Sequence, residues 1–349
     1  MSSKPSHILV IRISAMGDVA MTIPVIERLL ISNSELKITV LTKAFFRPLF
    51  DGLPRTQVIT ADIHGKHKGI SGIWRLANEL ITLNFDCVAD LHHVLRTRIL
   101  CLFLLFHGIK SRHIDKGRNE KRKLIRRKNK VFKPLKTAHE RYADVFQELG
   151  YQVDLSLPIS KKKLPLSKEI LTSYKIDFSK NVIGIAPFAA HKSKQYPISK
   201  MNSIISRIEE EVDCQLVLFG GGENEVERLE EIANSHPNIV SIAGKLSFKD
   251  ELTLISNLTM MISMDSGNGH LAAIFGVDVL TIWMGTHPYA GFAPFKQTSK
   301  LQFLPNLNEF NYLPNSIFGK KELKEHEAIA ESIEPDLILE KIKKKLIRN

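Results

Sequence analysis

Residues 260–284 read MMISMDSGNGHLAAIFGVDVLTIWM: an apolar run, a turn containing glycines, a stretch of small apolar residues and a second apolar run. Short apolar runs that alternate with helical stretches are typical of a parallel sheet whose two faces are both covered. We therefore predict strands at 260–264 and 279–284, joined by a helix that begins near Gly267.

The same alternation extends over the rest of the chain. Further strands are predicted at residues 7–13, 37–41, 57–60, 87–90, 182–186, 215–219 and 239–241. The fold class is therefore α/β, with two tandem doubly wound, Rossmann-like domains and a cleft between them. We expect an N-terminal domain at 1–160, a linker at 161–180, a C-terminal domain at 181–330, and a final helix within 331–349 that packs back on the N-terminal domain.

The composition is that of a globular protein with one strongly basic segment. Hydrophobic residues make up 44% of the 349 residues and charged residues 25%, which excludes wholesale disorder. The net charge is +12, and residues 110–136 alone hold thirteen Lys and Arg against two acids, a net +11. Such a segment attracts polyanions, namely nucleic acid, anionic lipid or phosphorylated glycolipid, and composition does not choose among them. We place this segment on the N-terminal domain.

Cysteines and apolar runs exclude other classes. Cys87, Cys101 and Cys214 are too few and too widely spaced for a disulfide framework or a Cys-x-x-Cys metal site, as expected in a reducing cytosol. The N-terminal apolar run ends at Arg12, so we interpret it neither as a signal peptide nor as a membrane span. Residues 99–106 are far shorter than the roughly 20 residues that a spanning helix needs, and we predict that they form a buried helix face.

Ligands of doubly wound sheets bind beyond the carboxyl ends of the strands, so the loops after strands are the candidate sites. After the first strand, Gly17 allows a ligand to come close, and Asp18 is a candidate general base. The alternative is that Asp18 only caps the next helix. In the loop 187–197, Lys192 and Lys194 are candidates for binding phosphate, and the alternative is a solvated basic loop.

Two further loops contain glycines. Residues 220–222 are all glycine, and Glu223 or Glu225 behind them is a candidate for binding a ribose; the alternative is that these acids stabilise a helix N-terminus. The second loop predicts a phosphate site at a helix N-terminus, where backbone N–H groups bind anions. Its members are Asp265, Ser266, Gly267 and His270. The alternatives are a helix cap for Asp265 and a packed core position for His270.

Several other sites are disfavoured. Residues 267–272 match the dinucleotide pattern G-x-G-x-x-A, but no acid occurs between Asp278 and Glu309 to hold a ribose, which argues against a nicotinamide dehydrogenase. The chain has no P-loop, D-x-D, HExxH, cysteine cluster or G-x-S-x-G. We therefore expect phosphate chemistry based on lysines and helix N-termini, with no metal site and no cofactor.

These motifs resemble one known family. ILVIRISAMGDVAMTIP near the N-terminus and SMDSGNGHLAAIFGVDVLTIWMGTHP near residue 270 resemble the bacterial heptosyltransferases of lipopolysaccharide core assembly, in glycosyltransferase family 9 with the GT-B fold. The resemblance implies inverting, metal-independent transfer of a heptose from ADP-heptose to a lipid-anchored, anionic acceptor. It implies that Asp18 is the catalytic base and that Lys194 steadies the departing diphosphate.

The resemblance also assigns the donor site. Its implied residues are Gly17, Lys192, Glu223 or Glu225, Leu246 on the adenine side, Asp265, Ser266, Gly267 and His270. We further expect the basic segment to bind the acceptor through Lys121, Arg122, Lys123, Arg126 and Arg127. The protein is then cytoplasmic and peripheral at the inner face of the inner membrane. The alternatives are another nucleotide-sugar donor, or a nucleic-acid-binding protein, which the single aromatic residue of the segment, Phe132, disfavours.

Overall fold

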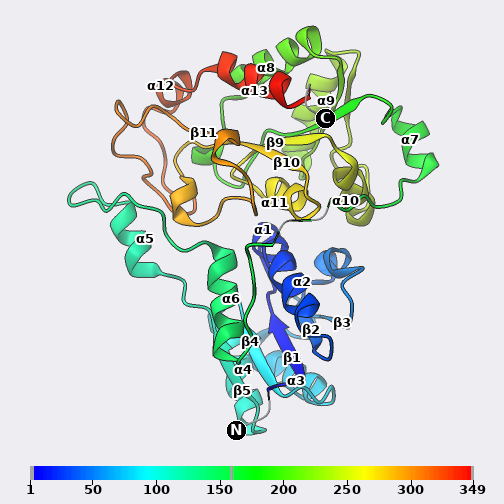
Figure 1. Cartoon of the computed structure of the whole chain (residues 1–349), viewed down its shortest axis with the longest axis vertical. Helices are drawn as coiled ribbons and strands as arrows, with labels where there is room; N and C mark the ends of the chain where they lie inside the picture. The colour runs from blue at the N-terminus through cyan, green and yellow to red at the C-terminus, as the bar shows by residue number, and fades with distance from the viewer. Residues whose placement is uncertain (1–3, 158, 160, 347–349) are drawn as a thin grey trace. The chain divides into compact units, whose positions relative to one another are not determined.

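The computed structural model describes residues 4–157, 159 and 161–346. Its internal contacts divide the chain into two compact units. Unit 1 consists of Met1–Gly117 and Lys136–Leu157, and unit 2 consists of Arg118–Leu135 and Pro158–Asn349. The chain therefore passes between the units after Gly117, after Leu135 and after Leu157, and Figure 1 colours it along this path.

Unit 1 contains a parallel sheet in the order β3-β2-β1-β4-β5. Its strands are β1 (His7–Ile11), β2 (Lys37–Thr42), β3 (Thr56–Thr60), β4 (Cys87–Asp90) and β5 (Lys110–His113). Its helical segments are α1 (Met16–Ala20), α2 (Ile23–Ile31), η1 (Ala44–Phe50), α3 (Gly69–Ile81), α4 (Leu95–Phe106) and α6 (Ala138–Glu148). On one face of the sheet, Ile11 packs with Leu76 of α3 and Leu104 of α4.

Unit 2 contains a second parallel sheet, in the order β11-β10-β9-β6-β7-β8. Its strands are β6 (Asn181–Ala186), β7 (Cys214–Leu218), β8 (Ile239–Ser241), β9 (Met260–Met264), β10 (Asp278–Ile282) and β11 (Gln302–Phe303). Its helical segments are α5 (Arg118–Leu124), α7 (Lys168–Tyr174), η2 (Lys192–Lys194), α8 (Ile198–Glu211), α9 (Glu223–Asn234), α10 (Phe248–Asn257), α11 (Gly267–Ile274), η3 (Pro288–Ala290), η4 (Ser299–Leu301), α12 (His326–Glu331) and α13 (Pro335–Leu346).

The predicted α/β class with two parallel sheets is confirmed, and each predicted strand has a counterpart among the described residues. The strands are buried because helices cover the sheets: the central residues of β1 and β9 have no more than 1% of their surface exposed. The edge strand β5 was not predicted, since its sequence KSRH is polar and lies inside the basic segment.

The segments that join and end the predicted domains differ from expectation. The segment predicted as a linker packs on unit 2, where Lys162 N–H donates to Phe275 O at 3.1 Å and Leu164 N–H to Ser256 Oγ at 2.9 Å. Residues 158 and 160, at the predicted end of the N-terminal domain, lie outside the described residues.

The final helix, which we predicted to pack on the N-terminal domain, belongs to unit 2. Helix α13 packs on α8 of unit 2, where its apolar residue Ile342 joins the core. Arg207 of α8 binds Asp336 at 2.5 Å, and Lys343 binds Glu211 at 2.6 Å. Residues 347–349 of the predicted C-terminal segment lie outside the described part of the chain.

Residues 99–106 are also not a wholly buried helix face. They lie in α4, which buries Leu100 and Leu104 but exposes Leu102, Leu105 and Phe106 to solvent. The prediction was wrong because an apolar run predicts burial on every side, whereas α4 packs on the sheet through one side only.

Candidate active site

In both sheets, many of the candidate residues follow strands at a switch point, where the strand order reverses direction. In unit 1 this point lies between β1 and β4, and in unit 2 between β6 and β9. The loops that leave two neighbouring parallel strands in opposite directions open a crevice at their carboxyl ends. The loops after these four strands are therefore considered first, and those after β7, β8 and β10 lie at the same edge of the second sheet.

In unit 1, Asp18 lies in the first turn of α1, directly after β1. Its Oδ2 is 2.5 Å from Nη2 of Arg12, and it also accepts a long hydrogen bond of 3.4 Å from Ala15 N–H. The Asp18 side chain keeps 30% of its surface exposed, whereas the Arg12 side chain is buried. Asp18 therefore does cap its helix, as the alternative held, and it also presents a carboxylate to solvent. Gly17, beside it, is half-buried.

Arg12 is held from two sides. Its Nη1 donates to Leu91 O, after β4, at 2.6 Å, and its guanidinium lies 5.9 Å from the ring centroid of Tyr142 in α6. The Tyr142 hydroxyl donates to Asp18 O at 3.3 Å, and burial raises the pKa of that hydroxyl. Because β4 and α6 both fix the guanidinium, the direction of the Asp18 carboxylate is fixed as well.

His92 lies next to this group and was not predicted. Burial, and then the positive charge of Arg12, lower the pKa of His92 to about 4, so its imidazole is neutral at neutral pH. Its Nδ1 is buried without a hydrogen-bond partner among the described residues. A neutral imidazole beside a carboxylate can donate or accept a hydrogen bond with a sugar hydroxyl. Its signal in the sequence was its position immediately beyond a predicted strand.

In unit 2, Lys194 and Asp265 are joined in an ion pair. Lys194 Nζ is 2.8 Å from Asp265 Oδ2, and the Thr286 hydroxyl donates to the same oxygen at 2.8 Å. Asp265 is buried, with 7% of its surface exposed, and Lys194 is nearly so. Lys194 is therefore not a solvated surface lysine. Thr286 was missed, although it lies in the loop directly after the predicted strand 279–284.

Hydrogen bonds to neighbouring loops hold the Lys194 loop in place. Ser193 Oγ donates to Gly319 O, and Gly285 N–H donates to Ser193 O at 2.8 Å. A Cβ at Gly319 would lie 2.4 Å from Cγ of Lys194, and Gly319 has a φ of +76°, so only glycine fits there. These contacts aim Lys194 at Asp265. Lys192, in the same short helical turn, is exposed.

The N-terminus of α11 has the features of an anion site. Ser266, its N-cap, makes no side-chain capping bond, and its Oγ is buried without a partner in the described part of the chain. Gly267 opens the helix, and His270 is buried on its first turns. Gly269 is required by packing, since a Cβ there would lie 2.6 Å from Ser263 Oγ. Unpaired N–H groups and a free hydroxyl suit a phosphate.

The two acids that follow the glycine-rich loop, Glu223 and Glu225, have different surroundings. Glu225 Oε2 accepts a hydrogen bond of 3.0 Å from Gly221 N–H, so this carboxylate stabilises its own loop. Glu223, the first residue of α9, is exposed. Leu246, in the loop after β8, is half-buried. The exposed carboxylate of Glu223 is therefore the one available to a ligand.

The expected acceptor residues lie in a segment that belongs mostly to unit 2. We call Arg118–Leu135 the basic arm. Leu124 of the arm is buried with Ala290 and Ile317, and Lys121 Nζ lies 4.3 Å from the ring centroid of Phe292. The arm was therefore misplaced on the N-terminal domain. The apolar residues of the arm determine where it packs. They are few among its many cations, so the sequence did not reveal this packing.

The rest of the arm is anchored to the same loops of unit 2. Lys130 Nζ donates to Asn311 O at 3.2 Å and to Leu313 O, and Leu135 N–H donates to Tyr289 O at 3.0 Å. Seven cations of the arm are exposed to solvent: Arg118, Arg122, Lys123, Arg126, Arg127, Lys128 and Lys133. Lys121 therefore serves the docking of the arm, and the other four predicted acceptor residues, Arg122, Lys123, Arg126 and Arg127, are exposed to an anionic ligand.

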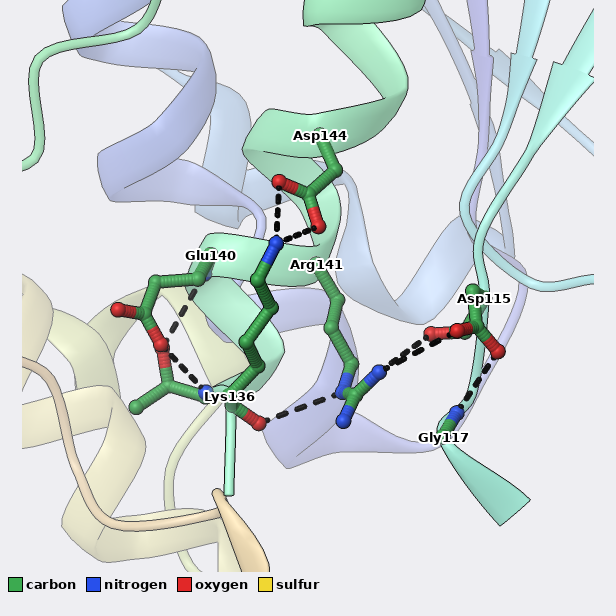
Figure 2. Close-up of polar contacts among 7 residues, drawn as sticks. Asp115, Gly117, Lys136, Glu140, Arg141 and Asp144 are labelled. Carbon is green, nitrogen blue, oxygen red and sulfur yellow. Dashed lines mark hydrogen bonds and ion pairs between the residues drawn. The ribbon is translucent and has the colours of Figure 1, made fainter. Parts of the chain in front are cut away.

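Two residues of unit 1 that flank the arm in the sequence, Asp115 and Lys136, are bound by Arg141 of α6. Figure 2 shows its buried guanidinium donating to Lys136 O at 3.3 Å and to Asp115 O at 3.2 Å. Asp115 in turn accepts a hydrogen bond of 2.9 Å from Gly117 N–H. A Cβ at Gly117 would lie 2.2 Å from Arg141, and Gly117 has a φ of +59°. The points at which the chain leaves and re-enters unit 1 are thus determined by one arginine.

No three His, Cys, Asp or Glu side chains gather as a metal-binding group within residues 4–157, 159 and 161–346. Nor does any helix described there combine the length and apolar character needed to cross a membrane.

Comparison with known proteins places the chain in a family. The sequence model of glycosyltransferase family 9 (heptosyltransferase) matches residues 73–309, well over half of the chain. The chain is 24% identical over 297 residues to the lipopolysaccharide core heptosyltransferase OpsX of Haemophilus influenzae, covering 81% of this chain and 80% of that one.

Solved structures show the same fold. A glycosyltransferase family 9 protein from Veillonella parvula has a TM-score of 0.76 at 17% identity, covering 100% of this chain and 99% of that one. The ADP-heptose lipopolysaccharide heptosyltransferase II of E. coli has a TM-score of 0.68 at 18% identity, covering 98% and 99%. The two parallel-sheet units are thus those of a GT-B enzyme. The chain belongs to glycosyltransferase family 9 and is a glycosyltransferase.

The Thr286 hydroxyl offers a test of the Asp265 site. Thr286→Val keeps the shape and removes one hydrogen bond to a buried carboxylate, which we expect to lower the free energy of unfolding by about 2 kcal/mol. Denaturant unfolding measures this loss. Thr281→Val is the matched control, because Thr281 is buried and its Oγ1 has no partner within the described residues. A loss of stability equal to that of the control would contradict the role of Thr286.

Proposed function

We propose that this protein transfers a heptose from ADP-heptose to the lipid-anchored inner core of lipopolysaccharide, with inversion and without a metal ion. One similar protein is a lipopolysaccharide core heptosyltransferase, and another is an ADP-heptose lipopolysaccharide heptosyltransferase. Both names support this choice of donor and acceptor. The observation that carries the proposal is the arrangement of Lys194, Asp265 and Thr286 beside the free N-terminus of α11.

The donor binds to unit 2. Its diphosphate accepts hydrogen bonds from the N–H groups of α11 and from the Ser266 hydroxyl, and Lys194 supplies the positive charge that stabilises the leaving ADP. This lysine and the helix N-terminus take the place of a metal ion, so the reaction needs no metal and no cofactor. Glu223 accepts hydrogen bonds from the ribose, and Leu246 lies on the adenine side. Lys192 and His270 complete the phosphate site.

The acceptor reacts beside Asp18 of unit 1. The acceptor hydroxyl oxygen forms a bond to the anomeric carbon of the heptose, while the bond between that carbon and the β-phosphate oxygen breaks. The Asp18 carboxylate takes the hydroxyl proton, and the electron pair of the broken bond leaves with ADP. Because the oxygen attacks opposite the leaving group, the configuration inverts. Gly17 leaves room for the donor, and Arg12 holds Asp18 in place.

Such an acceptor is an anionic glycolipid, which fits the proposal that the protein acts in the cytoplasm, peripherally at the inner face of the inner membrane. Nucleic acid is not a partner in this proposal. The exposed cations of the basic arm instead attract the phosphates and acidic sugars of the acceptor.

Product analysis tests the proposal. Purified protein with ADP-heptose and truncated lipopolysaccharide should give an acceptor that has gained one heptose, in the presence of a chelator as in its absence. ADP-glucose and UDP-sugars serve as competing donors. Faster transfer from one of those donors would refute the assignment of ADP-heptose, and dependence on an added metal would refute the metal-independent mechanism.

The basic arm gives a second prediction. Changing Arg122, Lys123, Arg126 and Arg127 together to glutamine should raise the KM for the anionic acceptor by about tenfold or more, since it removes four charges that meet it. The affinity for ADP and the melting temperature should stay unchanged, because these side chains are exposed while Leu124 and Lys121 keep the arm docked. Equal losses of acceptor and ADP binding would show that the charges support the fold instead.

A further inference from the structure

Helix α4 exposes several of its apolar side chains to solvent in the described structure. Its sequence LRTRILCLFLLF places apolar residues all round the helix, although it packs on the sheet through one side only. On the opposite side, Leu95, Leu102, Leu105 and Phe106 are between 49% and 76% exposed. A surface helix normally presents polar residues there, so contiguous exposed leucine and phenylalanine indicate a binding surface.

Helix α3 extends this surface. Ile70 and Trp74, one turn apart, are 67% and 57% exposed. The buried sides of α3 and α4 share one core layer of the sheet, and the two helices contact each other. Their outer sides therefore face away from the sheet together. We call these six exposed residues and the helix surface between them the α3–α4 surface.

The charges around the α3–α4 surface are positive. Helix α4 contains Arg96 and Arg98 and no acid, and the adjoining strand β5 adds Lys110. The one acid of α3, Glu79, is already paired with Lys66 at 3.2 Å. Two copies of this surface would bring arginines against arginines, so charge disfavours self-association. An anionic partner is favoured instead.

The surface also begins at the edge of the sheet where Asp18 lies. Helices α3 and α4 start just after the carboxyl ends of β3 and β4, and Asp18 follows the carboxyl end of β1 in the same parallel sheet. Ile70 and Leu95, at the two helix starts, therefore lie at that edge. A lipid-anchored substrate of Asp18 would need a membrane near this edge.

We propose that the α3–α4 surface docks unit 1 on an anionic phospholipid bilayer, with its leucines and aromatic rings in the headgroup boundary and its arginines on the lipid phosphates. Amphipathic helices bind bilayers in this way, through buried apolar area and attraction to anionic lipid. This binding stands on the exposed residues themselves. Only its link to the acceptor rests on the proposed function.

The fluorescence of Trp74 can report binding of the α3–α4 surface to a bilayer. Of its two tryptophans, Trp283 is buried, with 1% of its surface exposed, and Trp74 lies on the α3–α4 surface. Vesicles of phosphatidylethanolamine with phosphatidylglycerol should move the emission of the full chain to shorter wavelength and protect Trp74 from an aqueous quencher. Phosphatidylcholine vesicles should have a much smaller effect, and high salt should reverse part of the binding. Binding that leaves Trp74 emission unchanged would place the contact elsewhere, for example on the basic arm, and overturn the proposal.

Variants test the apolar contribution. Changing Leu102, Leu105 and Phe106 to glutamine should lower the vesicle partition coefficient by roughly tenfold or more. The control changes Ile31 and Leu337 to glutamine; they are 66% and 48% exposed on other helices, so vesicle binding should not change. Equal partition of the triple variant and the wild type would overturn the proposal. So would a wild-type dimer that the triple variant converts to a monomer.

A soluble acceptor separates this inference from the proposed function. With a delipidated core oligosaccharide, the triple variant should transfer sugar at the wild-type rate, and with the same acceptor in vesicles it should be several-fold slower. If the wild type transfers no heptose to either acceptor, the proposed function fails. The vesicle-binding measurements then still test whether the α3–α4 surface binds a bilayer. If the variant is equally slow on both acceptors, the substituted residues support catalysis or folding and the docking proposal fails.

Discussion

Asp18→Asn should slow sugar transfer by about a thousandfold while the protein folds and binds ADP normally. Asparagine has nearly the shape of aspartate but cannot take the proton of the acceptor hydroxyl. Asparagine keeps a side-chain oxygen that can accept a hydrogen bond from the buried Arg12 guanidinium, so we expect the fold to be retained. The donor site should not change, because ADP is assigned to unit 2. The turnover number should fall, with the ADP dissociation constant unchanged by calorimetry.

Asp51→Asn is the matched control, an exposed aspartate of unit 1 whose substitution should leave transfer unchanged. A transfer rate for Asp18→Asn within a few-fold of the wild type would refute the base assignment. Asp18 would then be only a helix cap and a partner for Arg12. His92 would become the next candidate, since its neutral imidazole lies in the same part of the sheet edge.

The sequence predicts the sheets of this protein well because their strands are buried on both sides. Strands such as β1 and β9 consist almost entirely of apolar residues, a pattern that the sequence alone reveals. Strand β5 was not predicted because it is a polar edge strand. The basic arm was misplaced for a related reason: the buried Leu124 and the ring of Phe132 against Tyr289 hold it on unit 2, yet cations dominate its composition.

The candidate site was predicted one residue at a time, and the partners of those residues were not. Asp18, Lys194 and Asp265 were recognisable because each follows a strand in a loop. Tyr142 is 124 residues from Asp18 along the chain, and only the fold shows that it is a neighbour. The same holds for Thr286, since a threonine after a strand has no distinctive pattern until Asp265 is seen to accept its hydrogen bond.

Lys194→Met should have the second large effect, and it should reduce both catalysis and stability. Loss of the ammonium group removes charge stabilisation from the leaving ADP, which we expect to lower kcat/KM by about 100- to 1000-fold. Among the described residues, it also leaves the buried Asp265 carboxylate with only the Thr286 hydroxyl as a side-chain partner, which we expect to cost about 3 kcal/mol of stability. Steady-state kinetics and denaturant unfolding measure the two losses separately.

The double variant Lys194→Met with Asp265→Asn distinguishes the two roles of the lysine. Without the buried negative charge, the missing ammonium no longer matters for folding, so most of the lost stability should return. Transfer should stay low, because an amide cannot balance the charge that develops on ADP. Recovery of both stability and transfer would mean that Lys194 only neutralises Asp265. Recovery of stability alone would mean that the ion pair with Asp265 holds Lys194 in position before the donor binds. The diphosphate of the bound donor then replaces Asp265 as the partner of the lysine.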